Sequence, residues 1–433
     1  MEIDTGSTAW VITAAALVLL MTPGLSLFYG GMTRAKGVLN MMMMSFVSII
    51  VVTVLWTLYG HSLAFSEAGN SFLNNIIGGF DNLGLSGLYD SATDGIPDLV
   101  FSAFQLTFAI ITVALISGAI ADRARFGAWV AFAVLWATLV YFPVAHWVWG
   151  GGWLGSLGIM DFAGGTVVHI NAGAAALALA LVVGKRYGWR KEPMRPHNLP
   201  LVLLGAAILW FGWFGFNAGS ELGVDQTTAL AFMNTQIATA IAAGGWIVVE
   251  KLRDGHSTSL GVASGAVAGL VAITPSCAFV QPIGAAIIGL LAGVICAYAV
   301  GLKYKLGYDD SLDVVGVHLV GGVIGSVMLG FVAAYPGDGQ SAGLFYGGGV
   351  SQLGLQVLGP VAVCLYSFVV SWILGKIIDK VMGFRIPEEE EITGIDITTH
   401  AETGYDLGTV HASGVASSVN GPVPVQSEKK VDA

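Results

Sequence analysis

Two histidines lie in closely similar contexts, one in each half of this 433-residue chain. His169 and His318 each follow a valine and precede a glycine by four residues, in the pattern Val-His-x-x-x-Gly, and each has an aspartate upstream, Asp161 and Asp313. Both histidines stand in apolar sequence, where an ionisable side chain is unfavourable unless it is paired or faces a cavity. Two neutral imidazoles can share a hydrogen bond, relay a proton or guide a small polar molecule. The alternatives are two separate structural histidines, or a pair of haem ligands, for which no other sequence feature speaks.

A second group of residues combines aromatic rings with a hydroxyl near the ends of apolar stretches. It comprises Phe108, Trp149, Phe216 and Ser220. Aromatic faces attract a partly desolvated cation, and a hydroxyl can accept a hydrogen bond from it. The combination favours a small cation that is also a hydrogen-bond donor. The alternative is an interfacial aromatic belt, which is the interpretation we prefer for Trp10, Trp56 and Trp153.

The aspartates and the remaining histidines are expected to have structural roles. A carboxylate at Asp161 can cap the helix that carries His169, because the free amides and the helix dipole favour an anion there. Asp313 is interpreted as a structural anchor at the start of the other histidine helix. The four other histidines considered are interpreted as solvated or structural: His61, His146, His197 and His256.

The composition is that of a polytopic membrane protein. Hydrophobic residues make up 55% of the chain and charged residues 11%, about half the charged fraction of a soluble domain. The 60 glycines lie within apolar segments, where small residues four apart allow close helix packing, as at Gly289-x-x-x-Gly293. The three cysteines lack metal-ligand spacing, and no nucleotide or nucleic-acid motif is present. We expect no metal, no cofactor and no nucleic-acid partner.

Eleven apolar stretches are long enough to cross a bilayer as helices. They cover residues 8–30, 38–63, 98–121, 127–149, 165–184, 199–219, 227–249, 258–275, 281–301, 314–334 and 352–378. The composition therefore predicts an all-α membrane protein with eleven transmembrane helices.

Charge is distributed unevenly between the connecting loops. All 18 lysines and arginines fall in alternate loops, at the end of the last span or after it, while acidic residues occupy the other loops. The positive-inside rule then places the N-terminus outside and the C-terminus in the cytoplasm, in the plasma (inner) membrane. Ten of the spans divide into five plus five, and an odd number per half inverts the second half. His169 and His318 then occupy equivalent spans, and the eleventh helix is expected to lie on the periphery.

The chain is expected to have three parts. Residues 1–383 form the transmembrane transport domain, 384–406 a cytoplasmic regulatory tail, and 407–433 a Gly-, Ser-, Val- and Pro-rich extension without periodicity, expected to be disordered. The N-terminus lacks the basic segment of an ordinary cleavable signal peptide.

Four motifs resemble the ammonium transporter family (Amt/Mep/Rh), specifically its prokaryotic Amt branch. They are Asp161-Phe-Ala-Gly-Gly-Thr-Val-Val-His-Ile-Asn171, Gly212-Trp-Phe-Gly-Phe-Asn-Ala-Gly-Ser220, Ala145-His-x-Val-Trp-Gly-Gly-Gly152 and Phe28-Tyr-Gly-Gly31. The resemblance extends from about residue 8 to about residue 406. It implies eleven spans, a five-plus-five inverted repeat and a homotrimer with one pore per subunit.

The resemblance also implies roles for individual residues. Trp149 and Ser220, with Phe108 beside them, correspond to the outer ammonium-recruitment site, and Phe108 and Phe216 to a stacked phenyl gate. His169 and His318 correspond to the pore histidines. Asp161, Trp213 and Thr274 correspond to supporting positions.

The implied activity is transport without covalent catalysis. Ammonium would be recruited, lose its proton near the gate and cross as ammonia, with the proton crossing separately so that net uptake is electrogenic. The tail motifs from Gly383 to Asp406 imply control by a P-II signalling protein at the cytoplasmic face. Alternatives are a neutral ammonia channel of the Rh type, an ammonium sensor, or a membrane haem or redox enzyme.

Overall fold

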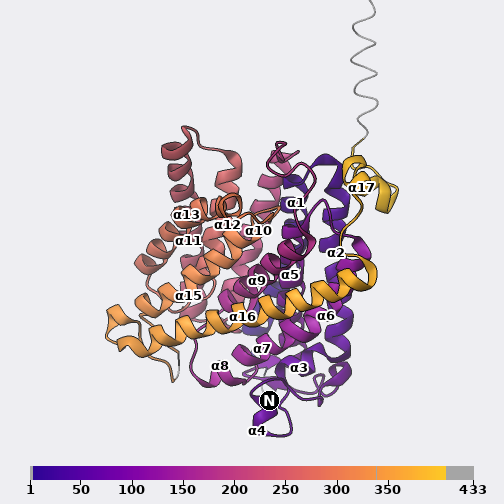
Figure 1. Cartoon of the computed structure of the whole chain (residues 1–433). Helices are drawn as coiled ribbons and strands as arrows, with labels where there is room; N and C mark the ends of the chain where they lie inside the picture. The colour runs from indigo at the N-terminus through magenta and orange to yellow at the C-terminus, as the bar shows by residue number, and fades with distance from the viewer. Residues whose placement is uncertain (1–2, 338, 406–433) are drawn as a thin grey trace, which may run out of the picture.

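The computed structural model describes residues 3–337 and 339–405, and they form a bundle of long apolar helices (Figure 1). The extension predicted for residues 407–433 lies outside the described residues. The α-helices are α1 (Thr5–Met32), α2 (Val38–Leu55), α3 (His61–Phe65), α4 (Ser71–Asn74), α5 (Asp98–Ile116), α6 (Phe126–Trp136), α7 (Phe142–Trp149), α8 (Trp153–Ser156), α9 (Asn171–Val183), α10 (Leu199–Gly219), α11 (Gln226–Asp254), α12 (Ser259–Ile273), α13 (Pro282–Ala299), α14 (Leu302–Leu306), α15 (Val320–Val332), α16 (Gly349–Met382) and α17 (Glu388–Thr393).

Shorter helical turns and one small hairpin complete the described structure. The 3-10 turns are η1 (Ala35–Gly37), η3 (Leu83–Leu85), η4 (Ser117–Ile120) and η8 (Leu344–Tyr346). The π-helical turns are η2 (Trp56–Gly60), η5 (Ala137–Tyr141), η6 (Gly165–Ile170), η7 (Val315–Leu319) and η9 (Asp396–His400). The antiparallel strands β1 (Ala92–Thr93) and β2 (Ile96–Pro97) are a small exception to the all-α prediction.

Ten helical segments of the described chain are long and apolar enough to cross a membrane. Several are continuous runs of named elements, such as α2–η2–α3 and α6–η5–α7. The remaining predicted stretch, the eighth along the chain at 258–275, forms α12, which has only 15 residues. At about 1.5 Å per residue this helix is shorter than a bilayer core of about 30 Å. Its neighbours enclose it almost completely, so other helices rather than lipid cover most of its surface.

The longest helix, α16, runs obliquely across one face of the bundle (Figure 1). Its 34 residues correspond to about 51 Å, which exceeds the bilayer core and requires a tilted path. Its outward face carries exposed apolar side chains, including Val361, Leu365 and Val369. These side chains suit contact with lipid tails.

Small residues set the distance between neighbouring helices. A methyl group added at Gly289 or Gly293 of α13 would overlap backbone atoms of α11, at Ala238 and Ala242 respectively. Gly205 of α10 approaches the backbone of α1 at Phe28 in the same way. The four-residue glycine spacing read from the sequence therefore marks a real packing surface at α13.

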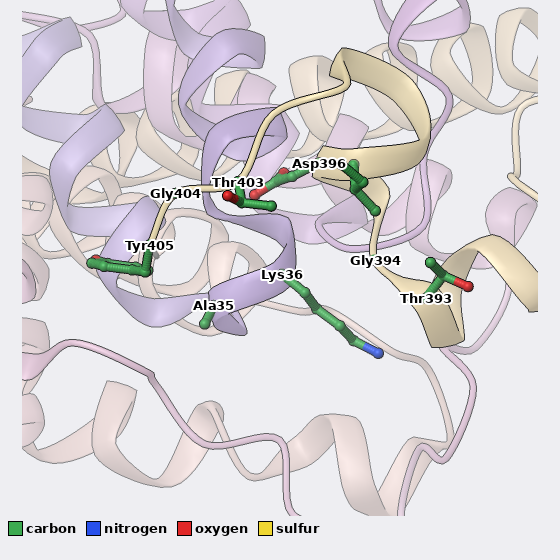
Figure 2. Close-up of a pocket in the computed structure, with 9 residues that line it drawn as sticks. Ala35, Lys36, Thr393, Gly394, Asp396, Thr403, Gly404 and Tyr405 are labelled. Carbon is green, nitrogen blue, oxygen red and sulfur yellow. The ribbon is translucent and has the colours of Figure 1, made fainter. Parts of the chain in front are cut away.

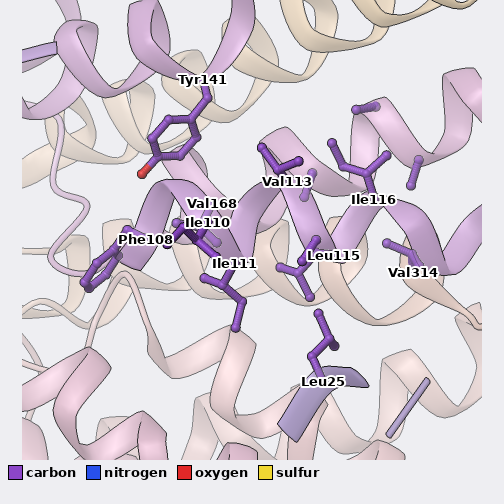
Figure 3. Close-up of a cluster of buried hydrophobic side chains, with 14 of the residues drawn as sticks. Leu25, Phe108, Ile110, Ile111, Val113, Leu115, Ile116, Tyr141, Val168 and Val314 are labelled. Atoms are coloured by element: carbon purple, nitrogen blue, oxygen red, sulfur yellow. The ribbon is translucent and has the colours of Figure 1, made fainter. Parts of the chain in front are cut away.

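Helix α5 lies at the centre of the apolar core. Figure 3 shows Ile110, Ile111, Val113, Leu115 and Ile116 of this helix together with side chains of other elements. Leu25 comes from α1, Tyr141 from η5, Val168 from η6 and Val314 from the residue before η7. Elements from both halves of the chain therefore pack on one central helix.

Ion pairs connect several of the basic loops at the end of the bundle that carries α17. Arg34 and Arg186 both contact Asp122, at 3.0 and 3.5 Å, and Arg186 also pairs with Asp309 at 2.9 Å. The N-terminus lies at the opposite end from α17 (Figure 1). The loops grouped by charge in the sequence thus meet in space.

The tail packs against the same end of the bundle. Both carboxylate oxygens of Asp396 accept backbone N–H bonds at the start of α2, from Leu39 at 2.9 Å and Asn40 at 2.8 Å. Figure 2 shows Thr403, Gly404 and Tyr405 of the tail facing η1, with Lys36 beside a cavity of about 170 Å³. The tail is therefore attached to the first loop of the bundle.

Candidate functional site

The two histidines meet at the centre of the molecule. The Nδ1 atoms of His169 and His318 lie 3.3 Å apart, within hydrogen-bond distance, and both side chains are buried. One ring must donate and the other must accept, so at least one of the two is neutral. Each histidine is the penultimate residue of a π-helical turn, η6 or η7, and a 13-residue α-helix follows each turn.

The glycines of the Val-His-x-x-x-Gly pattern explain why the rings can meet. A methyl group at Gly173 would lie 2.6 Å from the backbone nitrogen of Leu319, the residue after His318. A methyl group at Gly322 would lie 2.9 Å from a side-chain carbon of Ile170, the residue after His169. Each helix thus uses the glycine four residues beyond its histidine to approach the turn of the other. The contact is reciprocal, as in a pair related by two-fold symmetry.

Asp161 holds the first histidine turn. Its carboxylate accepts four backbone N–H bonds, from Gly164, Gly165, Thr166 and Val167, at 2.6 to 3.1 Å. These are the amides that the start of a helix leaves unpaired. Burial raises the pKa of this carboxyl to about 6, although the four N–H bonds oppose the rise.

Asp310 is the counterpart of Asp161 in the second half, and the sequence comparison did not single it out. It precedes His318 by eight residues, as Asp161 precedes His169, and it accepts the N–H of Val315 at 2.8 Å. Burial raises the pKa of the Asp310 carboxyl to about 6 as well. Asp313, the upstream aspartate noted in the sequence, instead pairs with Lys303 at 2.6 Å. The equal eight-residue spacing was the signal that could have identified Asp310.

Aromatic rings form a continuous column above the histidines. Trp149 lies edge-to-face with Phe108 at 6.0 Å between ring centroids, and Phe108 lies 4.2 Å from Phe216. Phe216 in turn lies 6.0 Å from His169. The column brings together side chains from α5, α7, α10 and η6, which are far apart in the sequence.

Trp213 and Thr274 support the column from the side. The Trp213 ring stacks on His169 at 5.3 Å, and its Nε1–H donates to Thr274 Oγ1 at 2.9 Å. Trp149 Nε1–H donates to the carbonyl of Asp161 at 2.8 Å. The stacking and the two hydrogen bonds orient the rings that border the site.

The column separates two cavities of very different size. On the outer side, a cavity of about 320 Å³ is lined by Phe108, Trp149 and Ser220, together with Phe65, Phe101, Gln105, Val148, Phe162 and Leu222. On the inner side, a narrow apolar cavity around His169 and His318 leaves about 10 Å³ for the centre of a water-sized molecule, about one water. Phe108 and Phe216 are almost fully buried between them.

Ser220 presents an acceptor to the outer cavity. Its Oγ–H donates to the carbonyl of Phe216 at 2.8 Å, so the lone pairs of the hydroxyl remain available. A hydroxyl in this state suits a ligand that donates hydrogen bonds.

Acidic residues border an adjoining outer cavity of about 360 Å³. Glu221 and Asp94 line it together with Trp149. Burial and repulsion by Asp225 raise the pKa of Glu221 to about 7. The functional interpretation of the sequence did not include Glu221, although its position next to Ser220 was a usable signal. Phe65 and Phe101 line both outer cavities and were missed because aromatic residues at the ends of apolar stretches are common.

No group of three or more His, Cys, Asp or Glu side chains within residues 3–337 and 339–405 is arranged to hold a metal ion.

A closed column of aromatic rings between a wide cavity and a buried histidine pair, within a bundle of helices long enough to cross a membrane, suits a membrane transport protein. A profile described as "Ammonium Transporter Family" matches residues 9–405. The chain is 54% identical over 439 residues to an ammonium transporter of Mycobacterium tuberculosis, covering 95% of this chain and 92% of that one. It is 48% identical to an ammonium transporter of Bacillus subtilis, covering 92% and 98% of the two chains.

Solved structures share the fold. Candida albicans Mep2 superposes with a TM-score of 0.84 at 36% identity, covering 90% of this chain and 88% of that one. A protein described as "Sensor Amt Protein" also gives a TM-score of 0.84, at 31% identity, covering 91% and 98%. The chain therefore belongs to the ammonium transporter family, and it is a multi-pass membrane protein with a Mep2/Amt fold.

Proposed function

We propose that this protein imports ammonium across the plasma membrane by recruiting the ion, removing its proton and conducting ammonia past His169 and His318. The observation that carries the proposal is the continuous column from Trp149 through Phe108 and Phe216 to the histidine pair. Its upper end adjoins a wide polar cavity and its lower end a narrow apolar one.

Recruitment is attributed to the outer cavity. Trp149 and Phe108 offer π-faces to a cation, and Ser220 offers an acceptor to its N–H groups. An alkali ion would receive the cation–π attraction but could donate no hydrogen bond. Proton-bearing ammonium is therefore the better ligand.

Deprotonation is attributed to the gate formed by Phe108 and Phe216. The cavity below the gate is apolar and holds about one small molecule, so a charged ion would lose its hydration there without replacement. Ammonium can shed a proton and enter as a neutral molecule, whereas potassium cannot. The proton is proposed to cross separately, which makes net uptake electrogenic.

The histidine pair is proposed to conduct the neutral molecule. Each imidazole can donate or accept a hydrogen bond while remaining uncharged. His169 Nε2 is buried without a hydrogen-bond partner among the described residues, so it can serve a passing ammonia molecule. Asp161, Trp213 and Thr274 are proposed to act indirectly, by holding the rings in place.

The topology and assembly are proposed on the same basis. The reciprocal contacts of Gly173 and Gly322 support a five-plus-five inverted repeat, with α12 as a short crossing helix and α16 at the periphery. The clustering of basic loops beside α17 supports a cytoplasmic C-terminus and an outer N-terminus. We infer a homotrimer, and native mass spectrometry giving only a monomer mass would reject it.

Control by a P-II signalling protein is proposed for the cytoplasmic face. The tail is fixed to the first loop through Asp396, and Tyr405 receives a hydrogen bond from Asn198 in the loop before α10. A partner that contacts the tail would therefore also contact the loops around the inner end of the bundle. The protein is expected to co-purify with a P-II protein. A variant that lacks the residues after 383 is expected to lose this association.

The experiment that tests the transport proposal measures current after ammonium addition to proteoliposomes on a solid-supported membrane. The wild type is expected to give a current with ammonium and none with potassium. Replacing His169 and His318 together with Ala is expected to abolish the current or its selectivity. The variant Gly354→Ala is a matched control, because a methyl group there meets no atom within 4 Å.

Other outcomes would favour the competing functions. A pH change in the vesicles without current would support a neutral ammonia channel of the Rh type. Absence of both signals from a folded protein would support an ammonium sensor, a function for which the similarity to "Sensor Amt Protein" is the relevant observation. A Soret absorbance band would support the haem alternative.

A further inference from the structure

His146 is a buried residue of α7 that the transport proposal does not use. It lies three residues before Trp149 and is fully buried. Its Nδ1 lies 3.0 Å from the carbonyl oxygen of Ala64, and its Nε2 lies 2.6 Å from the carbonyl oxygen of Asn74. Both ring nitrogens therefore face atoms that only accept hydrogen bonds.

A neutral imidazole cannot satisfy this arrangement. It carries one N–H, so its other nitrogen would present a lone pair to a carbonyl lone pair at hydrogen-bond distance. An imidazolium carries two N–H groups and donates to both carbonyls. The two acceptors therefore favour the doubly protonated form.

The surroundings stabilise a positive charge at this position. His146 lies in the last turn of α7, where the helix dipole favours a cation. Ala64 lies in the last turn of α3 and Asn74 ends α4, so both carbonyls belong to the group that helix ends leave unpaired. Gly150 permits the close approach, because a methyl group there would overlap the Ala64 carbonyl oxygen and lie 2.7 Å from His146 Nδ1.

The contact is part of a larger attachment between the outer loop and the segment that carries Trp149. Three consecutive carbonyls of that loop, at residues 74, 75 and 76, accept hydrogen bonds from α7 or α8. The donors are His146 Nε2, the backbone N–H of Trp153 at 3.2 Å and Trp147 Nε1 at 2.7 Å. In Figure 1, α3, α4, α7 and α8 lie together at the end of the bundle where the N-terminus is marked.

We propose that His146 is a buried imidazolium that holds the outer loop against the end of α7 by two hydrogen bonds. It thereby positions Trp149 in the ammonium-recruitment site. The recruitment role of Trp149 rests on the proposed function; the charge state of His146 does not. His146 is a positioning residue, since it does not belong to the residues that line the outer cavity.

The two carbonyl oxygens are the hydrogen-bond acceptors that face the His146 ring in the described structure. The titratable side chains on or beside the elements packed against α7 include Tyr59, His61, Glu67, Tyr141, Asp161, His169 and Tyr366. None of them is hydrogen-bonded to the His146 ring in the described structure. Loss of the proton would therefore leave one carbonyl without a donor.

The first test is nitrogen-15 NMR of the full-length protein in lipid nanodiscs, with labelled histidine rings, at about pH 7.5. Subtracting the spectrum of His146→Gln from that of the wild type is expected to leave the signals of two protonated nitrogens of the His146 ring. One protonated and one bare nitrogen would overturn the proposal. The control is His256→Gln, which removes a histidine whose side chain is exposed.

The second test measures the half-saturating ammonium concentration, expressed as ammonium ion at each pH, from the current. His146→Gln is expected to raise it about threefold to tenfold, with little change in maximal current, because a displaced Trp149 loses cation–π attraction. If the substitution removed only a positive charge and left Trp149 in place, the half-saturating concentration would fall instead. A fall or no change therefore overturns the positioning role.

A third measurement needs no variant. Dipolar transfer from the His146 ring nitrogens to the labelled carbonyl carbons of Ala64 and Asn74 is expected from both nitrogens through attached protons. Transfer from a single protonated nitrogen would reject the imidazolium. A wild type that gives no ammonium current but retains the doubly protonated ring would reject the proposed function alone.

Discussion

Glu221 lines the adjoining outer cavity beside Trp149, and its charge is expected to change over the physiological pH range. Its pKa is raised to about 7 by burial and by Asp225, so the side chain is neutral below that pH and negative above it. A negative charge beside Trp149 increases the local concentration of cations. We expect the half-saturating ammonium concentration of the wild type to fall about twofold to threefold between about pH 6 and about pH 8.

The variant Glu221→Gln tests this dependence at the same residue. It removes the titrating group with little change in volume, so its half-saturating concentration is expected to stay flat across that pH interval. Asp254→Asn is the control, because Asp254 is an exposed carboxylate in the last turn of α11. An unchanged pH slope in Glu221→Gln would show that another group is responsible.

At the scale of the element, the two histidine turns depend on their crossing glycines. Gly173→Ala places a methyl group against the backbone of Leu319, which cannot retreat without moving η7. We expect a destabilisation of about 1–3 kcal/mol and a loss of ammonium current, because the histidine rings are forced apart. Thermal unfolding in detergent and the current assay measure the two effects.

Gly354→Ala provides the matched comparison on α16, where the added methyl group meets open space. It is expected to keep the unfolding temperature or raise it slightly, since alanine favours helix over glycine. Equal effects of the two substitutions would contradict the crossing-glycine argument.

The aspartates that start the histidine turns can be compared in the same assay. Asp310→Ala removes an acceptor from buried amides at η7, as Asp161→Ala does at η6. Each is expected to lower stability by about 0.5–2 kcal/mol or more, with the larger loss at Asp161, whose carboxylate accepts four bonds. A stable Asp161→Ala variant with full current would contradict a capping role.

At the scale of the whole molecule, Arg186 joins loops that are distant in the sequence. It pairs with Asp309 at 2.9 Å and contacts Asp122 at 3.5 Å, and all three side chains are buried. Arg186→Gln leaves two buried carboxylates with less compensation. We expect the free energy of unfolding to fall by about 3–5 kcal/mol, with a clear fall in unfolding temperature.

Arg253→Gln is the contrasting substitution. Its partner Asp254 is adjacent in sequence and both side chains are exposed, so solvent and salt screen the pair. Its unfolding temperature is expected to remain close to that of the wild type. Similar losses of stability in the two variants would show that the buried ion-pair network stabilises the protein no more than the exposed pair does.

The class of fold and most of the candidate site could be predicted from the amino-acid sequence. Apolar stretches and the distribution of lysine and arginine are local properties, and the bilayer responds to them directly, so the helices and the grouping of loops followed from composition. His169, His318, Trp149, Phe216 and Ser220 were identifiable because their residue types are unusual for apolar sequence or occur in specific motifs.

The tertiary structure decided which distant atoms meet. The equivalence of Asp161 and Asp310 became plain when each was seen to accept amides at the start of a histidine turn. The role of Gly173 depends on Leu319, and the surroundings of the His146 ring depend on two carbonyls from α3 and α4. Such contacts join residues far apart in the chain and arise from the packing of all the helices together. No local pattern encodes them, because the position of a backbone carbonyl is set by where its helix ends and against what that end packs.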